Sequence, residues 1–215
     1  MKVRRTKTAN RILEVSLDLF NRFGEPNVAP ATIAAALGMS TGNLYYHYPS
    51  KAELINTLMD DYVQSLERVL PVATDVQSVE DTWFFLHTLF ELIDAYRFLY
   101  RDMSDLLSKN RPLEHQIQSL IAKKNKAFEV ALRGLVRHHV MRIDSADAKS
   151  IATCMTVLIT YWLSYEYIKN PRQALEPAHA QATILQGAFH VLNLLSPYLT
   201  NESREHLRAL SKAYL

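Results

Sequence analysis

The sequence has very little of three residue types that punctuate or cross-link a chain. It contains one cysteine, Cys154, with five glycines and eight prolines in 215 residues. A single cysteine forms no internal disulfide and no cysteine cluster for a metal, which suits a reducing cytoplasm. The scarce glycines and prolines leave long uninterrupted segments, in which apolar residues recur with the helical period rather than in alternation. We therefore expect an all-α protein.

Sequence signatures of catalysis are also absent. The chain has no glycine-rich phosphate loop, no zinc-type His-Glu spacing and no Gly-x-Ser-x-Gly turn, and its cysteine lacks a local catalytic signature. These absences favour a binding protein over an enzyme, and they predict no cofactor.

Long apolar runs that would enter a membrane are missing as well. The N-terminus has no apolar signal-peptide segment, so we expect a cytoplasmic protein. Of two uncharged stretches, 150–165 is shorter than the roughly 20 residues that a bilayer span requires, and 177–201 holds several polar side chains. Burial against protein explains both stretches better than a membrane does.

The small net charge of +2 is unevenly distributed. Residues 1–51 carry seven lysines and arginines against three acidic residues, so this part has a charge of +4 and the remainder −2. A basic N-terminal module on a mildly acidic body is typical of a protein that meets a phosphate backbone at one end.

Residues 31–48 have the pattern of a helix-turn-helix. Ile33, Ala34 and Leu37 form one narrow apolar face, and a glycine follows at position 38, where it can turn the chain in the left-handed conformation. Ser40 can cap a second helix, which would carry Leu44 inward together with Tyr45 or Tyr48.

The outer face of that second helix has side chains suited to DNA. Small polar residues near its start suit base edges, glycine allows close backbone approach, and hydroxyl, imidazole and ammonium groups suit phosphate oxygens. The candidate DNA-binding residues of this face are Thr41, Gly42, Asn43, Tyr45, Tyr46, His47 and Lys51. Arg4, Arg5 and Lys7 form a basic arm that can reach a minor groove or phosphates, or can remain a solvated terminus. Helix pairs of this kind also occur in proteins that do not bind DNA.

The same residues resemble a known family. Ile33-Ala34 through Gly38-Met39-Ser40, followed by Gly42-Asn43-Leu44-Tyr45-Tyr46-His47-Tyr48 and Lys51, are similar to the signature of the tetracycline-repressor (TetR) family of bacterial transcriptional regulators. The resemblance covers residues 9–55. It implies a three-helix DNA-binding domain followed by a larger helical domain that binds a ligand and dimerises, which we place at residues 1–50 and 51–215. The sequence departs from the family at Ala29, where a threonine usually caps the next helix and touches phosphate, although Pro30 suits a first helical position.

The remainder predicts a series of amphipathic helices. A linking helix runs from Lys51 to about Leu70, with Ser50 as its cap, and another spans 78–96. The segment 96–102 opens a helix that extends to 107, and a helix over 113–140 directs Lys123, Lys124 and Lys126 outward. Further helices follow a cap at Asp144 or Ser145, then span 178–195 and 201–215.

Aromatic residues are plentiful in these helices. With Arg97, Arg101 or His138 as a polar anchor, they suit the site for a small apolar or aromatic effector that the family resemblance implies, although each aromatic residue is also explained as ordinary core. The candidate ligand-binding residues are Trp83, Phe90, Tyr96, Tyr100, Arg101, Tyr161, Trp162 and Tyr165.

The last two long helices have the composition of a subunit interface. The helix over 178–195 has an uncharged polar row between its apolar rows, formed by Thr183, Gln186, His190 and Asn193. Because surfaces without charge are typical of interface cores, we expect this helix and the one before it to form a homodimer, as the family resemblance implies.

The sequence thus predicts a DNA-binding transcriptional regulator, a homodimeric and ligand-responsive repressor on a near-palindromic operator. The alternative is a helical interaction protein or ligand-binding module without sequence-specific DNA binding.

Overall fold

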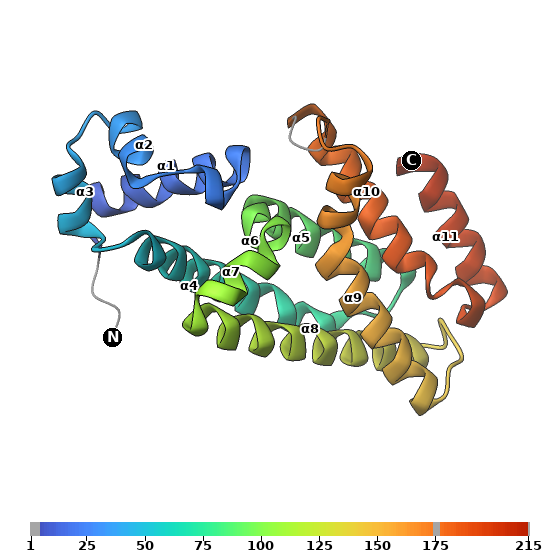
Figure 1. Ribbon diagram of the computed structural model, residues 1–215. Coiled ribbons are helices and arrows are strands. Elements are labelled where there is room, and N and C mark those ends of the chain that lie inside the picture. Colours follow the sequence, from blue (N-terminus) through green and yellow to red (C-terminus); the bar gives the residue numbers. More distant parts are fainter. Residues whose placement is uncertain (1–4, 174–176, 215) are drawn as a thin grey trace. The chain divides into compact units, whose positions relative to one another are not determined.

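The structure is a computed structural model that describes residues 5–173 and 177–214 (Figure 1). Within these residues the regular elements are helices, apart from one isolated β-bridge between Met141 and Leu199, so the all-α prediction is confirmed. The α-helices are α1 (Lys7–Phe23), α2 (Pro30–Ala36), α3 (Thr41–His47), α4 (Lys51–Val69), α5 (Val79–Ala95), α6 (Arg97–Arg101), α7 (Met103–Lys109), α8 (Arg111–Arg137), α9 (Ser145–Lys169), α10 (Pro177–Asn193) and α11 (Asn201–Tyr214). Three short 3-10 helices are η1 (Glu25–Asn27), η2 (Leu70–Asp75) and η3 (Ser196–Tyr198).

The chain forms two compact units. The first contains Met1–Gln64 and Ala95–Gln116, and the second contains Ser65–Asp94 and Ile117–Leu215. Helices α4 and α8 begin in the first unit and end in the second. The division at residue 50 stays a prediction, while the structure groups the start of α4 and residues 95–116 with the first three helices.

Helix α1 is the support of the first unit. The side chain of Thr6 accepts a hydrogen bond from the Ala9 N–H at 3.2 Å and so caps the helix. Ile12 and Phe20 are fully buried on its inner face, and Gly24 ends it with a φ of 85°. Helices α2 and α3 pack together beside it (Figure 1).

The core of the second unit depends on two glycines at close helix contacts. A Cβ on Gly134 of α8 would lie 2.3 Å from the Val76 carbonyl oxygen, and one on Gly187 of α10 would lie 2.7 Å from ring atoms of both Phe90 and Trp162. These two positions need glycine because no side-chain atom has room there. Helix α9 packs against α10, which in turn packs against α11 (Figure 1).

Two expectations about the helices are corrected. The segment from 96 to 107 is two helices, α6 and α7, because Asp102 leaves the helical conformation between them, with φ −102° and ψ 18°. Lys124 points inward, with 2 % of its surface exposed and its Nζ 3.5 Å from the Thr160 Oγ1. It lies on the same helix face as buried Leu120 and Phe128, one turn away on either side, so the helical period outweighs its charge.

The predicted caps agree with the structure. Ser50 accepts from the Glu53 N–H at 3.1 Å at the start of α4, and Asp144 accepts from the N–H groups of Ala146 and Asp147 at 2.8 Å at the start of α9. Asp144, rather than Ser145, is therefore the cap of α9.

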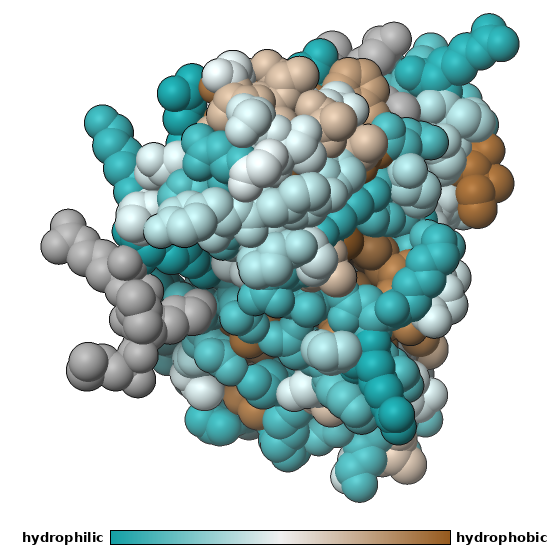
Figure 2. All heavy atoms as spheres, turned by 60° about the vertical axis from the view of Figure 1, so that its left-hand side comes forward, coloured by the Kyte–Doolittle hydropathy of each residue, from teal (hydrophilic) through white to brown (hydrophobic). Residues whose placement is uncertain are grey.

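In the described part of the chain, no helix is both long and apolar enough to cross a membrane. The face of the molecule in Figure 2 is largely hydrophilic, with hydrophobic residues in small separate groups.

Candidate nucleic-acid interface and effector residues

The turn between α2 and α3 has the geometry that the sequence predicts. Gly38 has a φ of 66°, the left-handed conformation, and the Met39 N–H reaches back to the Ala34 carbonyl at 3.0 Å. Ser40 then accepts from the Asn43 N–H at 3.2 Å and caps α3. These short-range contacts fix the angle between the two helices.

Two inward side chains anchor α3 to the rest of the first unit. Leu44 is 1 % exposed and Tyr48, just after the helix, is 6 % exposed. The Tyr48 hydroxyl donates to the Ala9 carbonyl of α1 at 3.3 Å, and burial raises the pKa of this phenol. Of the two tyrosines considered for the inner face, Tyr48 occupies it, and Tyr45 remains 43 % exposed.

The predicted base-reading and phosphate-binding residues of α3 share its outer surface. Gly42, Asn43, Tyr45 and Tyr46 are exposed, and Thr41 and His47 are half-buried. Among the large hydrophobic side chains of the described residues, Tyr46 is the most exposed, at 83 %. The Tyr46 and His47 rings meet edge to face with centroids 5.3 Å apart. A polar helix face is thus presented to solvent without covering side chains of the first unit.

The start of α2 lacks a side-chain cap, as Ala29 predicts. The Ala29 residue makes no capping hydrogen bond, and Pro30 occupies the first helical turn. A phosphate contact from the side chain at position 29 is ruled out by its methyl group.

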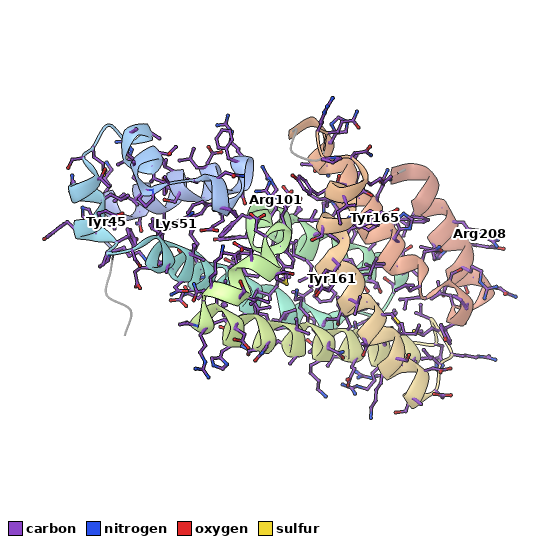
Figure 3. All side chains as sticks on the ribbon, in the orientation of Figure 1. Tyr45, Lys51, Arg101, Tyr161, Tyr165 and Arg208 are labelled. Atoms are coloured by element: carbon purple, nitrogen blue, oxygen red, sulfur yellow. The ribbon has the colours of Figure 1, made fainter. Side chains whose placement is uncertain are left out.

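Lys51, at the start of α4, is held by the first residue of η1, which follows α1. Its Nζ lies 2.7 Å from the Glu25 Oε1 and donates to the Glu25 carbonyl oxygen at 2.6 Å. The ammonium also lies 5.7 Å from the centre of the Phe20 ring. Figure 3 labels Lys51 at the start of α4 and Tyr45 on α3.

The predicted basic arm is partly engaged within the protein. Arg5 forms a two-pronged hydrogen bond with the Asp61 carboxylate of α4, at 2.5 and 2.7 Å, and this bond raises the pKa of the guanidinium. Lys7 is exposed at the first turn of α1, and Arg4 lies outside the described residues. Arg5 must therefore leave Asp61 before it can reach a phosphate.

A junction between α1 and residues 95–102 is the feature that sequence reasoning missed. The Asn21 side chain donates to the Ala95 carbonyl at 2.9 Å and accepts from the Phe98 N–H at 3.1 Å. Arg101 donates to the Phe20 carbonyl at 3.1 Å and lies 3.5 Å from that of Asn21. Arg101, a predicted ligand-binding residue, thus binds main-chain carbonyl oxygens in the last turn of α1; Figure 3 labels this residue.

Tyr96 and Tyr100, two other predicted ligand residues, surround Tyr62 of α4. The hydroxyls of Tyr62 and Tyr100 are hydrogen-bonded, and the Tyr96 ring lies 5.2 Å from that of Tyr62. Burial raises the pKa of Tyr62 well above its ordinary value, and burial also raises that of Tyr96.

In the second unit, Phe90 and Trp162 come together, and the Tyr165 ring lies 5.5 Å from that of Trp162. Phe90 and Trp162 both face Gly187, and the Trp162 Nε1 donates to the Thr183 carbonyl at 2.8 Å. Trp83 is buried on the same helix as Phe90. Tyr161 and Tyr165 are 54 % and 55 % exposed on α9 (Figure 3).

These tyrosines belong to an exposed apolar row, here called the α9 stripe, formed by Val157, Tyr161, Tyr165 and Ile168. All four are more than half exposed, and their spacing of three and four residues places them on one side of the helix. On the neighbouring α10, three members of the uncharged polar row are exposed, namely Gln186, His190 and Asn193. A hollow of about 390 Å³ lies between the two helices and is lined in part by Trp162, Tyr165 and His190.

Comparisons with known proteins agree with this geometry. Residues 12–58 match the family model described as bacterial regulatory proteins, tetR family, and residues 61–207 match one described as bacterial transcriptional repressor. The chain is similar to a TetR-family transcriptional regulator from Marinobacter aquaeolei VT8, with 29 % identity, a TM-score of 0.82, and coverage of 97 % of this chain and 99 % of that one.

Two more distant structures share the fold. One is a putative transcriptional regulator from Saccharomonospora viridis in complex with choline, with 19 % identity, a TM-score of 0.69, and coverage of 92 % of this chain and 100 % of that one. The other is the ketosteroid transcriptional regulator KstR2 of Mycobacterium tuberculosis, with 18 % identity, a TM-score of 0.65, and coverage of 92 % and 98 %. The helix-turn-helix geometry and the two family matches, which together span most of the sequence, show that the chain belongs to the tetR family of bacterial regulatory proteins and is a DNA-binding transcriptional regulator.

Proposed function

We propose that this regulator is a homodimeric, effector-responsive repressor that reads a near-palindromic operator in the cytoplasm and has no catalytic activity of its own. The observation that carries the proposal is the uncovered polar face of α3, capped by Ser40 and anchored by Leu44 and Tyr48. Helices of this kind place the residues of their first turns against base edges in the major groove.

Within this face, we assign base reading to Thr41 and Asn43 and phosphate contacts to the residues after them. These are Tyr45, Tyr46, His47 and Lys51, whose side chains can donate hydrogen bonds to phosphate oxygens. We expect Thr41→Ala or Asn43→Ala to cost about 1–3 kcal/mol of operator binding and to relax specificity, and Lys51→Met to weaken all duplexes alike. Equal losses on every sequence for all three variants would contradict base readout.

The α9 stripe supports the homodimer. Four apolar side chains in a row, beside an uncharged polar row on α10, have the composition of an interface core rather than of a solvated surface. A two-fold dimer places two α3 helices in successive major grooves about 34 Å apart, and a single α3 makes too few contacts for specific binding.

The dimer is tested by charge at the α9 stripe. The variant Tyr161→Glu/Tyr165→Glu buries two unpaired carboxylates in the proposed interface, so sedimentation should show monomers where the parent forms dimers. Both side chains are exposed within the chain, so the helix content should be unchanged. The matched control is Phe84→Glu, which alters another exposed aromatic residue, 63 % open, on α5. Dimers that persist in the double variant would place the interface elsewhere.

The operator is tested by selection from random duplexes. We expect a selected pool with two half-sites related by a two-fold axis, with affinity that falls steeply as salt rises. A pool without a regular half-site spacing would contradict the dimeric reading mode, and no salt-dependent duplex binding at all would favour the helical interaction protein instead.

The proposal includes an effector that contacts predicted aromatic residues of the helical body, of which Trp162 and Tyr165 line the hollow of about 390 Å³ beside α9 and α10. The related Saccharomonospora viridis structure holds choline, a small molecule, which supports an effector of that size. A ligand can release DNA only if it prefers one spacing of the two α3 helices, with α4 as the lever. Saturating effector that leaves operator affinity unchanged would reject this mechanism.

A further inference from the structure

In the DNA-free protein, the ammonium of Lys51 is already bound by another residue of the first unit. Its Nζ contacts two oxygens of one residue, the Glu25 carboxylate at 2.7 Å and the Glu25 carbonyl at 2.6 Å. The side chains of Lys51 and Glu25 are only 23 % and 12 % exposed, so water screens their attraction less than it would at an open surface. Two of the three N–H donors of the ammonium are thus used inside the protein.

Glu25 is itself held by Asp102, the residue directly after α6. Its backbone N–H donates to the Asp102 Oδ2 at 3.0 Å, and Asp102 follows directly on Arg101, which binds the α1 carbonyls. Gly24, the residue before Glu25, brings the chain into this position with a φ of 85°. The contacts therefore run without a gap from Asp102 through Glu25 to Lys51, all inside the first unit.

We propose that Glu25 restrains the Lys51 ammonium in the DNA-free protein and that DNA binding exchanges the Glu25 carboxylate for a phosphodiester oxygen. This inference rests on the proposed function, since it takes Lys51 to be a phosphate contact. Glu25 is then a positioning residue that sets the affinity for DNA without touching it. Because Asp102 fixes the backbone of Glu25, a shift of residues 97–102 changes how readily Lys51 is released.

The exchange has a definite energetic sign. Binding must break a partly buried ion pair and leave the Glu25 carboxylate near the phosphate backbone, so the glutamate opposes binding. Glu25→Gln keeps the shape and an acceptor oxygen but removes the charge. We expect it to tighten binding to every duplex by about two- to fivefold, the range that pairs of this kind contribute.

The test compares four proteins, namely the parent, Glu25→Gln, Lys51→Met and the double variant. Each is titrated by fluorescence anisotropy against the duplex that the parent selects and against a scrambled duplex, at one salt concentration. We expect Glu25→Gln to bind both duplexes more tightly, Lys51→Met to bind both more weakly, and the double variant to match Lys51→Met. The gain from Glu25→Gln thus requires the lysine, a dependence that a merely structural role of Glu25 does not produce.

The matched control is Glu53→Gln, which removes an exposed glutamate two residues after Lys51. If it tightens binding as much as Glu25→Gln does, or if the gain from Glu25→Gln persists in the double variant, general repulsion explains the result and the proposal is overturned. A Glu25→Gln protein that binds no better than the parent also overturns it, while the proposed function stands. A parent that binds no duplex overturns both. Circular dichroism of each variant at the assay temperature separates these outcomes from unfolding.

Discussion

Replacing Gly24 with alanine tests the junction between α1 and α6. Gly24 has a φ of 85° and a ψ of 143°, close to a region that only glycine occupies readily, and a Cβ there would lie 2.8 Å from the Arg101 Nη2. The backbone strain costs about 1–3 kcal/mol. Displacing the guanidinium from the α1 carbonyls adds about 1–2 kcal/mol of lost hydrogen bonding. We expect Gly24→Ala to lower the free energy of unfolding by about 2–5 kcal/mol.

Gly38→Ala is the matched control, since Gly38 also has a positive φ, 66°, but nothing lies within 4 Å of the added Cβ. Its cost should be the left-handed strain alone, about 1–2 kcal/mol. Urea unfolding followed by far-ultraviolet circular dichroism gives both values. In an Arg101→Ala background, the cost of Gly24→Ala should fall by about 1–2 kcal/mol, because no guanidinium is left to displace. An equal cost in both backgrounds would refute the reasoning that Gly24 makes room for Arg101.

Three further substitutions have distinct expected outcomes. Burial holds the pKa of Tyr62 above its unfolded value of 10.0, so stability that is complete below pH 10 declines by up to about 1.4 kcal/mol per pH unit above it. Guanidinium unfolding between pH 9 and 11 should show a shallower decline for Tyr62→Phe, and no change for exposed Tyr46→Phe. Gly42→Ala should fold normally, since its Cβ meets only the Ser40 Oγ at 3.9 Å, yet bind the operator more weakly if the backbone approaches DNA there. Arg5→Ala should lower stability by about 1 kcal/mol through loss of its bond to Asp61 and leave the salt dependence of DNA binding unchanged; a slope reduced by about 1 would instead make Arg5 a phosphate contact.

The start of α3 and the turn before it could be predicted from the sequence, because the residues that form them are close together in the chain. Ser40 caps an N–H three residues ahead, and Gly38 turns the chain next to the helix that it ends. Interactions of this range depend on residue type and spacing, which the sequence displays directly. The choice between Tyr45 and Tyr48 needed α1, since only Tyr48 can reach the Ala9 carbonyl.

The sequence could not predict the contacts that join distant segments. Arg101 and Phe20 are 81 residues apart, and Lys51 reaches a carbonyl 26 residues away. In the sequence, an arginine beside tyrosines suggests a polar anchor for a ligand. The contacts that Arg101 makes depend instead on the end of α1, which is distant in sequence and supplies the carbonyl oxygens that it binds. The predicted outward orientation of Lys124 is wrong, because its charge favours solvent while its helical position places it among buried residues.

At the junction between α1 and α6, most of the hydrogen bonds join a side chain to a main-chain group. Asn21 meets the carbonyl of Ala95 and the N–H of Phe98, and Arg101 meets the carbonyls of Phe20 and Asn21. Main-chain groups are the same whatever side chain a position carries. The outward residues of α1 to α3, and with them the preferred operator sequence, can therefore change without loss of the hydrogen bonds that join α1 to α6. A segment α1 to α3 grafted from a related protein should form the same junction with residues 95–101 if it keeps an asparagine at position 21 and a glycine at position 24.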